Sequence, residues 1–149
     1  MESRFETFTL QIAKISRAIR KIKTEEMSEF KLKSPHVSCL YFLYKQNGSL
    51  TAKELCDICD EDKAAISRSI EYLEEIGYIT CDSKTEKRYK SPLKLTPNGV
   101  KVGEVIARKI DNVLYDASIG LTEEARKTFY ESLILISDNL QKICNKYGE

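Results

Sequence analysis

Two apolar stripes at helical spacing, one near each end of the chain, most constrain what this sequence can fold into. The first stripe has apolar residues separated alternately by three and four positions, at Phe5, Phe8, Ile12, Ile15, Ile19 and Ile22. The second repeats that spacing at Phe129, Leu133, Ile136, Leu140, Ile143 and Tyr147. Such spacing places all members on one face of an α-helix, so both ends are predicted to be long amphipathic helices.

Two terminal stripes exceed what the core of one domain of 149 residues needs. One interpretation is that the stripes do no more than fill the core of a monomer. We favour the interpretation that they pair in a homodimer. The predicted dimerisation residues are Phe5, Phe8, Ile12, Phe129, Leu133, Ile136, Leu140 and Ile143. Between the stripes, Thr96 as N-cap, Pro97 at the first helical position and Gly120 as a stop signal predict another long helix.

The middle of the chain contains shorter elements separated by turn signals. After a helix that begins near Ser34, a capping box of Thr51 and Glu54 predicts a helix of barely two turns. A third helix follows, with Asp60 as its candidate cap and Gly77 at its end. A short helix, a tight turn and a second helix together indicate a helix-turn-helix motif.

A β-hairpin is predicted directly after this motif. The segment "YITC" reads as a strand with Ile79 and Cys81 on one face, and "SPLKL" as its antiparallel return with Leu93 and Leu95 inward. Because Pro92 has no N–H to donate, we expect an edge hairpin. The predicted fold class is therefore mainly α with a small two-stranded antiparallel wing (α+β), a winged helix-turn-helix plus long N- and C-terminal dimerisation helices.

Five cations gather on the loop and return strand of this predicted wing, at Lys84, Lys87, Arg88, Lys90 and Lys94. Residues 84–94 contain one acid, Glu86, so five positive charges minus one negative charge give +4, whereas the whole chain has a net charge of +1. A wing loop has no core to fill, so the cluster indicates a surface for phosphates. The alternative is a merely solvated charged hairpin.

The run "DKAAISRSIEYLEEIGYI", followed by "KRYKSPLKLTPNG", resembles the winged helix-turn-helix of the MarR-type (multiple antibiotic resistance) bacterial transcription regulators. The resemblance extends over nearly the whole chain. The matching positions are Ser67 and Arg68 in the recognition helix, Leu73, Glu74 and Gly77 at its end, Arg88 on the wing, and Leu95, Thr96 and Gly99 in the exit "LTPNG". Family wings alternate Asp and Arg, whereas this wing reads "DSKTEKRYK", which leaves Asp82 and Glu86 as alternative partners of Arg88.

The resemblance implies a single domain over residues 1–149. Residues 34–96 would form the DNA-binding lobe, and residues 1–33 and 97–149 would form the dimerisation region. It also implies a repressor that binds a pseudo-palindromic operator as a homodimer and is released by a small aromatic or phenolic effector. The scattered, odd-numbered cysteines and the lack of an apolar span or signal peptide make the cytoplasm the expected location. Family members place the second helix of the motif in the major groove of double-stranded DNA and the wing in the flanking minor groove.

The predicted DNA-binding residues are Lys63, Ala64, Ala65, Ser67, Arg68 and Ser69 on the recognition helix and Lys84, Lys87, Arg88 and Lys90 on the wing. An arginine on this helix can fork onto guanine O6 and N7, and small residues permit contact with thymine methyl groups. The crevice that the resemblance implies for an effector would be lined by Ile15, Ile19, His36, Cys39, Leu40 and Leu43, although the same residues would also suit an ordinary core.

Other classes of function remain as alternatives. The spacing of Cys56 and Cys59 in "CDIC" is that of a thiol redox sensor or half a zinc site, although packed thiols are the interpretation we favour. Zinc would need further ligands, and the chain has one histidine. A winged-helix adaptor that binds proteins is the other alternative. The sequence shows no catalytic signature, apolar span or signal peptide, so we expect a protein without enzymatic activity, metal, cofactor or membrane association.

Overall fold

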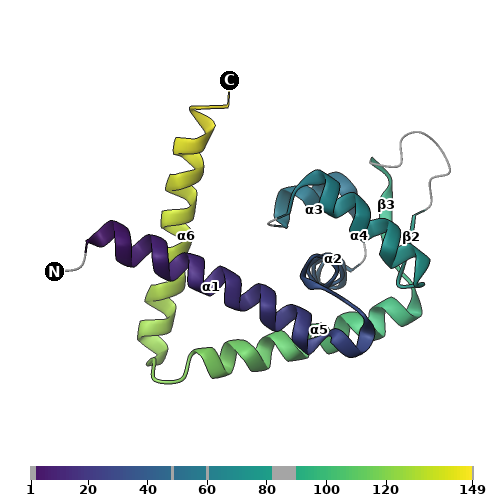
Figure 1. Ribbon diagram of the computed structural model, residues 1–149, viewed down its shortest axis with the longest axis horizontal. Helices are drawn as coiled ribbons and strands as arrows, with labels where there is room; N and C mark the ends of the chain where they lie inside the picture. The colour runs from purple at the N-terminus through teal and green to yellow at the C-terminus, as the bar shows by residue number, and fades with distance from the viewer. Residues whose placement is uncertain (1–2, 48, 60, 82–89, 149) are drawn as a thin grey trace. The chain divides into compact units, whose positions relative to one another are not determined.

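The computed structural model describes residues 3–47, 49–59, 61–81 and 90–148 of the chain. The chain divides into two compact units, Met1–Ile110 and Asp111–Glu149. Helices and strands of the first unit are α1 (Arg4–Glu26), the 3-10 helix η1 (Ser28–Phe30), α2 (Ser34–Lys45), β1 (Leu50–Thr51), α3 (Ala52–Ile58), α4 (Lys63–Glu75), β2 (Ile79–Cys81), β3 (Pro92–Leu95) and most of α5 (Pro97–Ala117) (Figure 1). The second unit contains the end of α5 and all of α6 (Glu123–Asn145).

Side-chain caps fix the helices of the helix-turn-helix where the sequence predicts them, with one shift. Thr51 Oγ1 accepts from the Glu54 N–H at 3.1 Å, and Glu54 Oε2 accepts from the Thr51 N–H at 2.8 Å, which completes the capping box of α3. The cap of α4 is Asp62 rather than Asp60, because Asp62 has an extended backbone and its Oδ1 accepts from the Ala65 N–H at 2.7 Å. Asp60 lies outside the described residues.

The sheet has three strands in the order β1-β3-β2, with both pairs antiparallel. The predicted antiparallel pair of β2 and β3 is confirmed, but the sheet has a third strand, β1, so the expected number of two strands is wrong. Leu50 pairs with Leu93 and Thr51 with Pro92, so β3 is the central strand. Pro92 is tolerated there because it is the first residue of the strand, where an N–H is least needed.

The core of the first unit lies where α2, α4, α5 and the sheet meet. Leu40 and Leu43 of α2, Ile66 and Leu73 of α4, and Ile106 of α5 are all almost completely buried in one cluster. Figure 1 looks nearly along the axis of α2, which lies among α3, α4 and α5. Burial of these aliphatic side chains stabilises the lobe by roughly 1.5–3 kcal/mol each, so the core holds the helices of the helix-turn-helix together.

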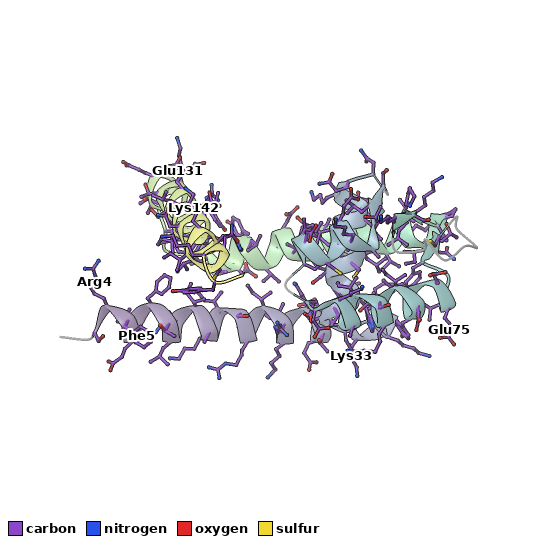
Figure 2. The ribbon with its side chains drawn as sticks, turned by 90° about the horizontal axis from the view of Figure 1, so that it is seen from above. Arg4, Phe5, Lys33, Glu75, Glu131 and Lys142 are labelled. Carbon is purple, nitrogen blue, oxygen red and sulfur yellow. The ribbon has the colours of Figure 1, made fainter. Side chains whose placement is uncertain are left out.

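The two terminal helices differ from this lobe, because neither α1 nor α6, each described over its whole length, contains a buried residue in the single chain. In Figure 2 the side chains of Arg4 and Phe5 project from the first turns of α1, and those of Glu131 and Lys142 project from α6. Both helices therefore present apolar stripes that their own chain does not bury.

A search for membrane-spanning segments was negative over the described ranges, whose helices are too polar or too short to cross a bilayer.

Candidate nucleic-acid interface

Helix α4 has one face in the core and one face in solvent. Ile66, Ile70 and Leu73 are buried, and their spacing of four and three residues keeps them on the inner face. Lys63, Ala64, Ser67 and Arg68 are exposed on the opposite face of the same helix. The predicted DNA-binding residues of this helix are therefore brought together on one surface, with two exceptions.

The exceptions are Ser69 and Ala65. Ser69 is 2% exposed, because it lies three positions after Ile66 and shares the inner face of α4. A buried hydroxyl cannot contact a phosphate or a base edge, so Ser69 does not belong to the interface. Ala65 is half-buried and lies at its margin. The burial of Ser69 could have been predicted from the sequence, because Ser69 lies beside the inner apolar stripe of Ile66, Ile70 and Leu73.

Charge is distributed unevenly along the exposed face of α4. The cations Lys63 and Arg68 lie in its first half, whereas Glu71 and Glu75 are exposed in its second half. Figure 2 labels Glu75 at the C-terminal end of the helix. A polyanion would be attracted to the first half and repelled by the second, and recognition helices contact base edges with their N-terminal residues.

Acidic residues before α4 are held by contacts within the protein. Asp62 caps the helix through its bond to the Ala65 N–H. Glu61 pairs with Arg20 of α1 at 3.7 Å, and the Glu61 side chain is only 15% exposed. Both carboxylates are therefore directed to protein groups, which reduces the repulsion they would exert on a phosphate backbone.

The wing flanks α4 through β2 and β3, where Ile79 pairs with Leu95 and Thr80 with Lys94. Lys90 and Lys94 are exposed on it. Lys84, Lys87 and Arg88, together with the candidate acids Asp82 and Glu86, lie outside the described residues. The described part of the wing thus contributes two exposed cations beside the helix-turn-helix.

A contact that sequence reasoning missed fixes the outer edge of α4. The Tyr72 hydroxyl donates a 2.6 Å hydrogen bond to the Lys31 carbonyl, and the His36 ring stacks on Tyr72 with centroids 4.4 Å apart. His36 Nδ1 in turn accepts from the Lys33 N–H at 3.0 Å. Burial, and secondarily the positive charge of Lys33, lowers the pKa of His36. In the sequence, the only indication of this contact was the single histidine at the start of a predicted helix.

A second set of contacts, made by the Thr96 hydroxyl, connects the end of α4 to the start of α5. Thr96 Oγ1 donates to the Gly77 carbonyl at 2.6 Å and accepts from the Gly99 N–H at 3.0 Å. A Cβ added at Gly99 would lie 2.0 Å from the Tyr78 carbonyl oxygen, so only glycine fits this crossing. The "LTPNG" segment therefore fixes the start of α5 against the turn that follows α4.

The predicted dimerisation residues lie on α1 and α6, and all are exposed except Leu133, which is half-buried. Phe5 is 74% exposed. The predicted effector residues are separated: Cys39, Leu40 and Leu43 fill the core, whereas Ile15 and Ile19 are exposed on α1 and His36 is half-buried. Cys39, Leu40 and Leu43 pack against other side chains. Of the two alternatives that the sequence left open for them, pocket or core, they therefore belong to the core.

All five cysteines are free thiols. Cys59 is the C-cap residue of α3 and is buried in the same core cluster as Cys39 of α2. No group of three or more His, Cys, Asp or Glu side chains within the described ranges is arranged to hold a metal ion.

Comparison with known proteins gives one match to a family model and many matches to solved structures. Residues 30–88 match the family model described as MarR family. A MarR protein from Peptoclostridium difficile has 22% identity and a TM-score of 0.85, with 98% of this chain and 95% of that chain covered. A putative MarR family regulator from Listeria monocytogenes complexed with 26mer DNA has 23% identity and a TM-score of 0.82, with 100% and 97% covered. The MepR–DNA complex of S. aureus has 19% identity and a TM-score of 0.77, with 93% and 99% covered.

A search of the curated proteins gave no match. The structural matches, all below 25% identity, establish the fold over nearly the whole chain, and the family model covers the helix-turn-helix and the start of the wing. The chain therefore has the winged helix-turn-helix fold, and its residues 30–88 match the model of the MarR family.

Proposed function

We propose that this protein is a transcriptional regulator that binds double-stranded DNA sequence-specifically as a homodimer. The observation that carries the proposal is the exposed first half of α4, where Lys63, Ser67 and Arg68 surround the small residue Ala64. The wing beside it adds the exposed cations Lys90 and Lys94. A helix with small residues and cations at its start, flanked by a basic hairpin, suits a major groove and its adjoining phosphates.

Each group on this surface has a distinct task in the proposed complex. Arg68 donates two hydrogen bonds to guanine O6 and N7, which distinguishes a G·C pair from the other three pairs. Ala64 permits close approach and packs on a thymine methyl group, and Ser67 donates to a phosphate or base edge. The wing lysines neutralise phosphates without reading sequence, and the proposal extends this task to Lys84, Lys87 and Arg88.

The two relatives solved with DNA support this assignment, since they share the fold of this chain at 23% and 19% identity. The exposed first half of α4 offers the position from which a helix of this fold can enter a major groove. Glu71 and Glu75 are exposed in the second half, which the proposal therefore directs away from the phosphates.

Exposed apolar side chains on α1 and α6 support the homodimer. Phe8, Ile12, Leu140 and Ile143 each expose at least 40% of their surface in the single chain. A second copy would remove these stripes from water, which stabilises the pair by about 25 cal/mol per Å² of apolar area buried. Two-fold symmetry then requires a pseudo-palindromic operator with half-sites about 10 base pairs apart, centre to centre.

Repression, with release by a small aromatic or phenolic effector, completes the proposal and follows from the family resemblance. A dimer on an operator that overlaps a promoter would block polymerase. Of the residues predicted to line an effector site, Ile15, Ile19 and His36 are the accessible ones. An effector that bound there would release DNA only if it preferred a different spacing of the two recognition helices.

Sequencing of genomic DNA fragments that co-purify with the protein tests this function. The expected result is enrichment of a short pseudo-palindromic motif, which a gel shift then binds with an affinity that falls steeply with salt. Footprinting should protect both half-sites. Recovery of random fragments, or protection of one isolated half-site, would contradict a symmetric sequence-specific regulator.

A further inference from the structure

Glu71 lies in the middle of the exposed face of α4, among the residues proposed to read DNA. Successive residues of an α-helix are about 100° apart around its axis, so Ser67 and Arg68 are separated by that angle. Glu71 follows Ser67 by four residues and Arg68 by three, so it lies between them, about 40° from Ser67. Ala64, about one turn earlier, occupies the same sector, and all four residues are exposed. Glu71 therefore shares one continuous face with the first half of α4.

The spacing of these four residues is that of a helix that reads a major groove. They stand at i, i+3, i+4 and i+7, in the order Ala64, Ser67, Arg68 and Glu71. The recognition helix of a homeodomain, which is also a helix-turn-helix protein, contacts bases from four positions with this same spacing. A helix that presents Arg68 to base edges in this way brings the Glu71 carboxylate to the base edges as well.

Contacts of the next residue fix the direction in which Glu71 points. The Tyr72 hydroxyl donates to the Lys31 carbonyl at 2.6 Å, and the Tyr72 ring stacks on His36. These contacts hold α4 against rotation about its axis, so Glu71 stays on the outer face. Over the residues that the structure describes, no hydrogen bond or ion pair of the protein engages the Glu71 carboxylate, whereas the Asp62 carboxylate caps the helix. The oxygens of Glu71 are therefore available to a donor on DNA.

A carboxylate at this position distinguishes the four bases by the groups that they present in the major groove. Guanine presents two acceptors, and thymine presents an acceptor and a methyl group, so neither offers a donor to Glu71. Adenine has a donor at N6 beside an acceptor at N7, which repels a carboxylate, whereas cytosine presents only its N4 amino donor. Removal of a carboxylate from water without a donor costs free energy, so the other three bases are penalised. Cytosine is the base that suits Glu71.

We propose that Glu71 is a specificity-determining residue that accepts a hydrogen bond from the N4 amino group of a cytosine. The inference rests on the proposed function and names one base of the operator. Three residues of helix rise about 4.5 Å, close to the spacing of about 3.4 Å between base pairs, so the cytosine lies in a base pair next to the guanine of Arg68. Glu71 adds discrimination rather than affinity, because its negative charge also repels the phosphates.

Selection of bound duplexes from a randomised pool, followed by sequencing, tests this inference. The wild-type protein should select cytosine at one position of each half-site, with a preference of at least about 5-fold, as for a typical specific contact. Glu71→Ala should lose the preference at that position. Glu71→Gln should change it to adenine, because a glutamine amide binds adenine N6 and N7 together. Both substitutions place a good helix former at an exposed position, so the fold is retained.

Glu75→Gln is the matched control, because it removes the same charge from an exposed position of the same helix, one turn beyond Glu71. It should leave every base preference unchanged. Binding to a scrambled duplex should tighten for Glu71→Ala, since one repulsive charge is lost. The inference fails if the wild-type protein and both Glu71 variants select the same motif, or if the position that changes prefers a base other than cytosine. A wild-type protein that selects no motif would instead refute the proposed function on which the inference rests.

Discussion

The Tyr72 hydroxyl donates a 2.6 Å hydrogen bond to the carbonyl of Lys31, a residue 41 positions earlier in the chain. Lys31 has a left-handed backbone, with φ 59° and ψ 34°, in the turn between η1 and α2. The His36 ring stacks on the Tyr72 ring at an interplanar angle of 24°. The turn before α2 therefore holds α4 by one hydrogen bond, and the first turn of α2 holds it by one stacked ring.

Tyr72→Phe should lower the free energy of unfolding by about 0.5–1.5 kcal/mol, because the ring stack is retained and only the hydrogen bond is lost. Urea denaturation measures this change. Tyr130→Phe on α6 removes an exposed hydroxyl and is the matched control, for which we expect no change beyond about 0.5 kcal/mol. Equal effects of the two substitutions would show that the Tyr72 bond contributes nothing to the lobe.

The pH dependence of stability should carry a signature of His36. Its pKa is lowered in the folded state by burial and by Lys33, and its Nδ1 accepts the Lys33 N–H, which a protonated ring could not do. The stabilising contribution is therefore complete above the unfolded value of about 6.5 and is lost as the pH falls below it, through the folded pKa. Because His36 is the only histidine, one imidazole resonance reports it by NMR. A midpoint at or above 6.5 would contradict this, and His36→Gln should flatten the stability profile in that range.

Local signals in the sequence predicted most of the lobe. The capping box of Thr51 and Glu54, the stop at Gly77 and the Thr96–Pro97 start of α5 all appear at the expected residues. Each depends on residues within four positions of one another, where spacing determines geometry. The exposed face of α4 followed from the same periodicity, which also places Ser69 inside.

Long-range contacts could not be predicted in this way. The pairing of Leu50 with Leu93 adds β1 to the sheet, yet two residues give no strand signal of their own. The bond from Tyr72 to Lys31 joins residues that only the folded lobe brings together. Whether Cys39, Leu40 and Leu43 line a pocket or fill a core also depends on the packing of neighbouring helices.

Gly99→Ala should destabilise the first unit by about 1–3 kcal/mol, because the new methyl group would collide with the Tyr78 carbonyl and force α5 away from the wing. Thermal unfolding followed by circular dichroism measures the loss. Gly148→Ala is the control, since no atom lies within 4 Å of an added Cβ there. A Gly99→Ala protein as stable as this control would mean that the crossing of α5 over Tyr78 is looser than described.

Leu133→Glu combined with Leu140→Glu should convert the proposed dimer into the 17.1 kDa monomer, because the paired stripes would bury unpaired charges. Sedimentation equilibrium at micromolar concentration measures this. The control is Ser132→Glu with Gln141→Glu, which adds the same charge at exposed positions next to the stripe and should leave the dimer intact. Operator binding should fall together with dimerisation, and full affinity in the monomer would contradict the symmetric arrangement.

Arg68→Ala should cost about 1–3 kcal/mol per contacted half-site on the operator and relax the preference at one base position, because it removes a bidentate contact to guanine. Binding to scrambled duplex should barely change. Arg88→Ala on the wing should instead weaken both duplexes and lower the slope of log affinity against log salt by about 1. Salt titrations of both variants distinguish these effects, and Arg126→Ala on α6, which removes a half-buried arginine paired with Glu123, controls for the loss of one positive charge. If Arg68→Ala weakened operator and scrambled duplex equally, Arg68 would contact phosphate rather than a base.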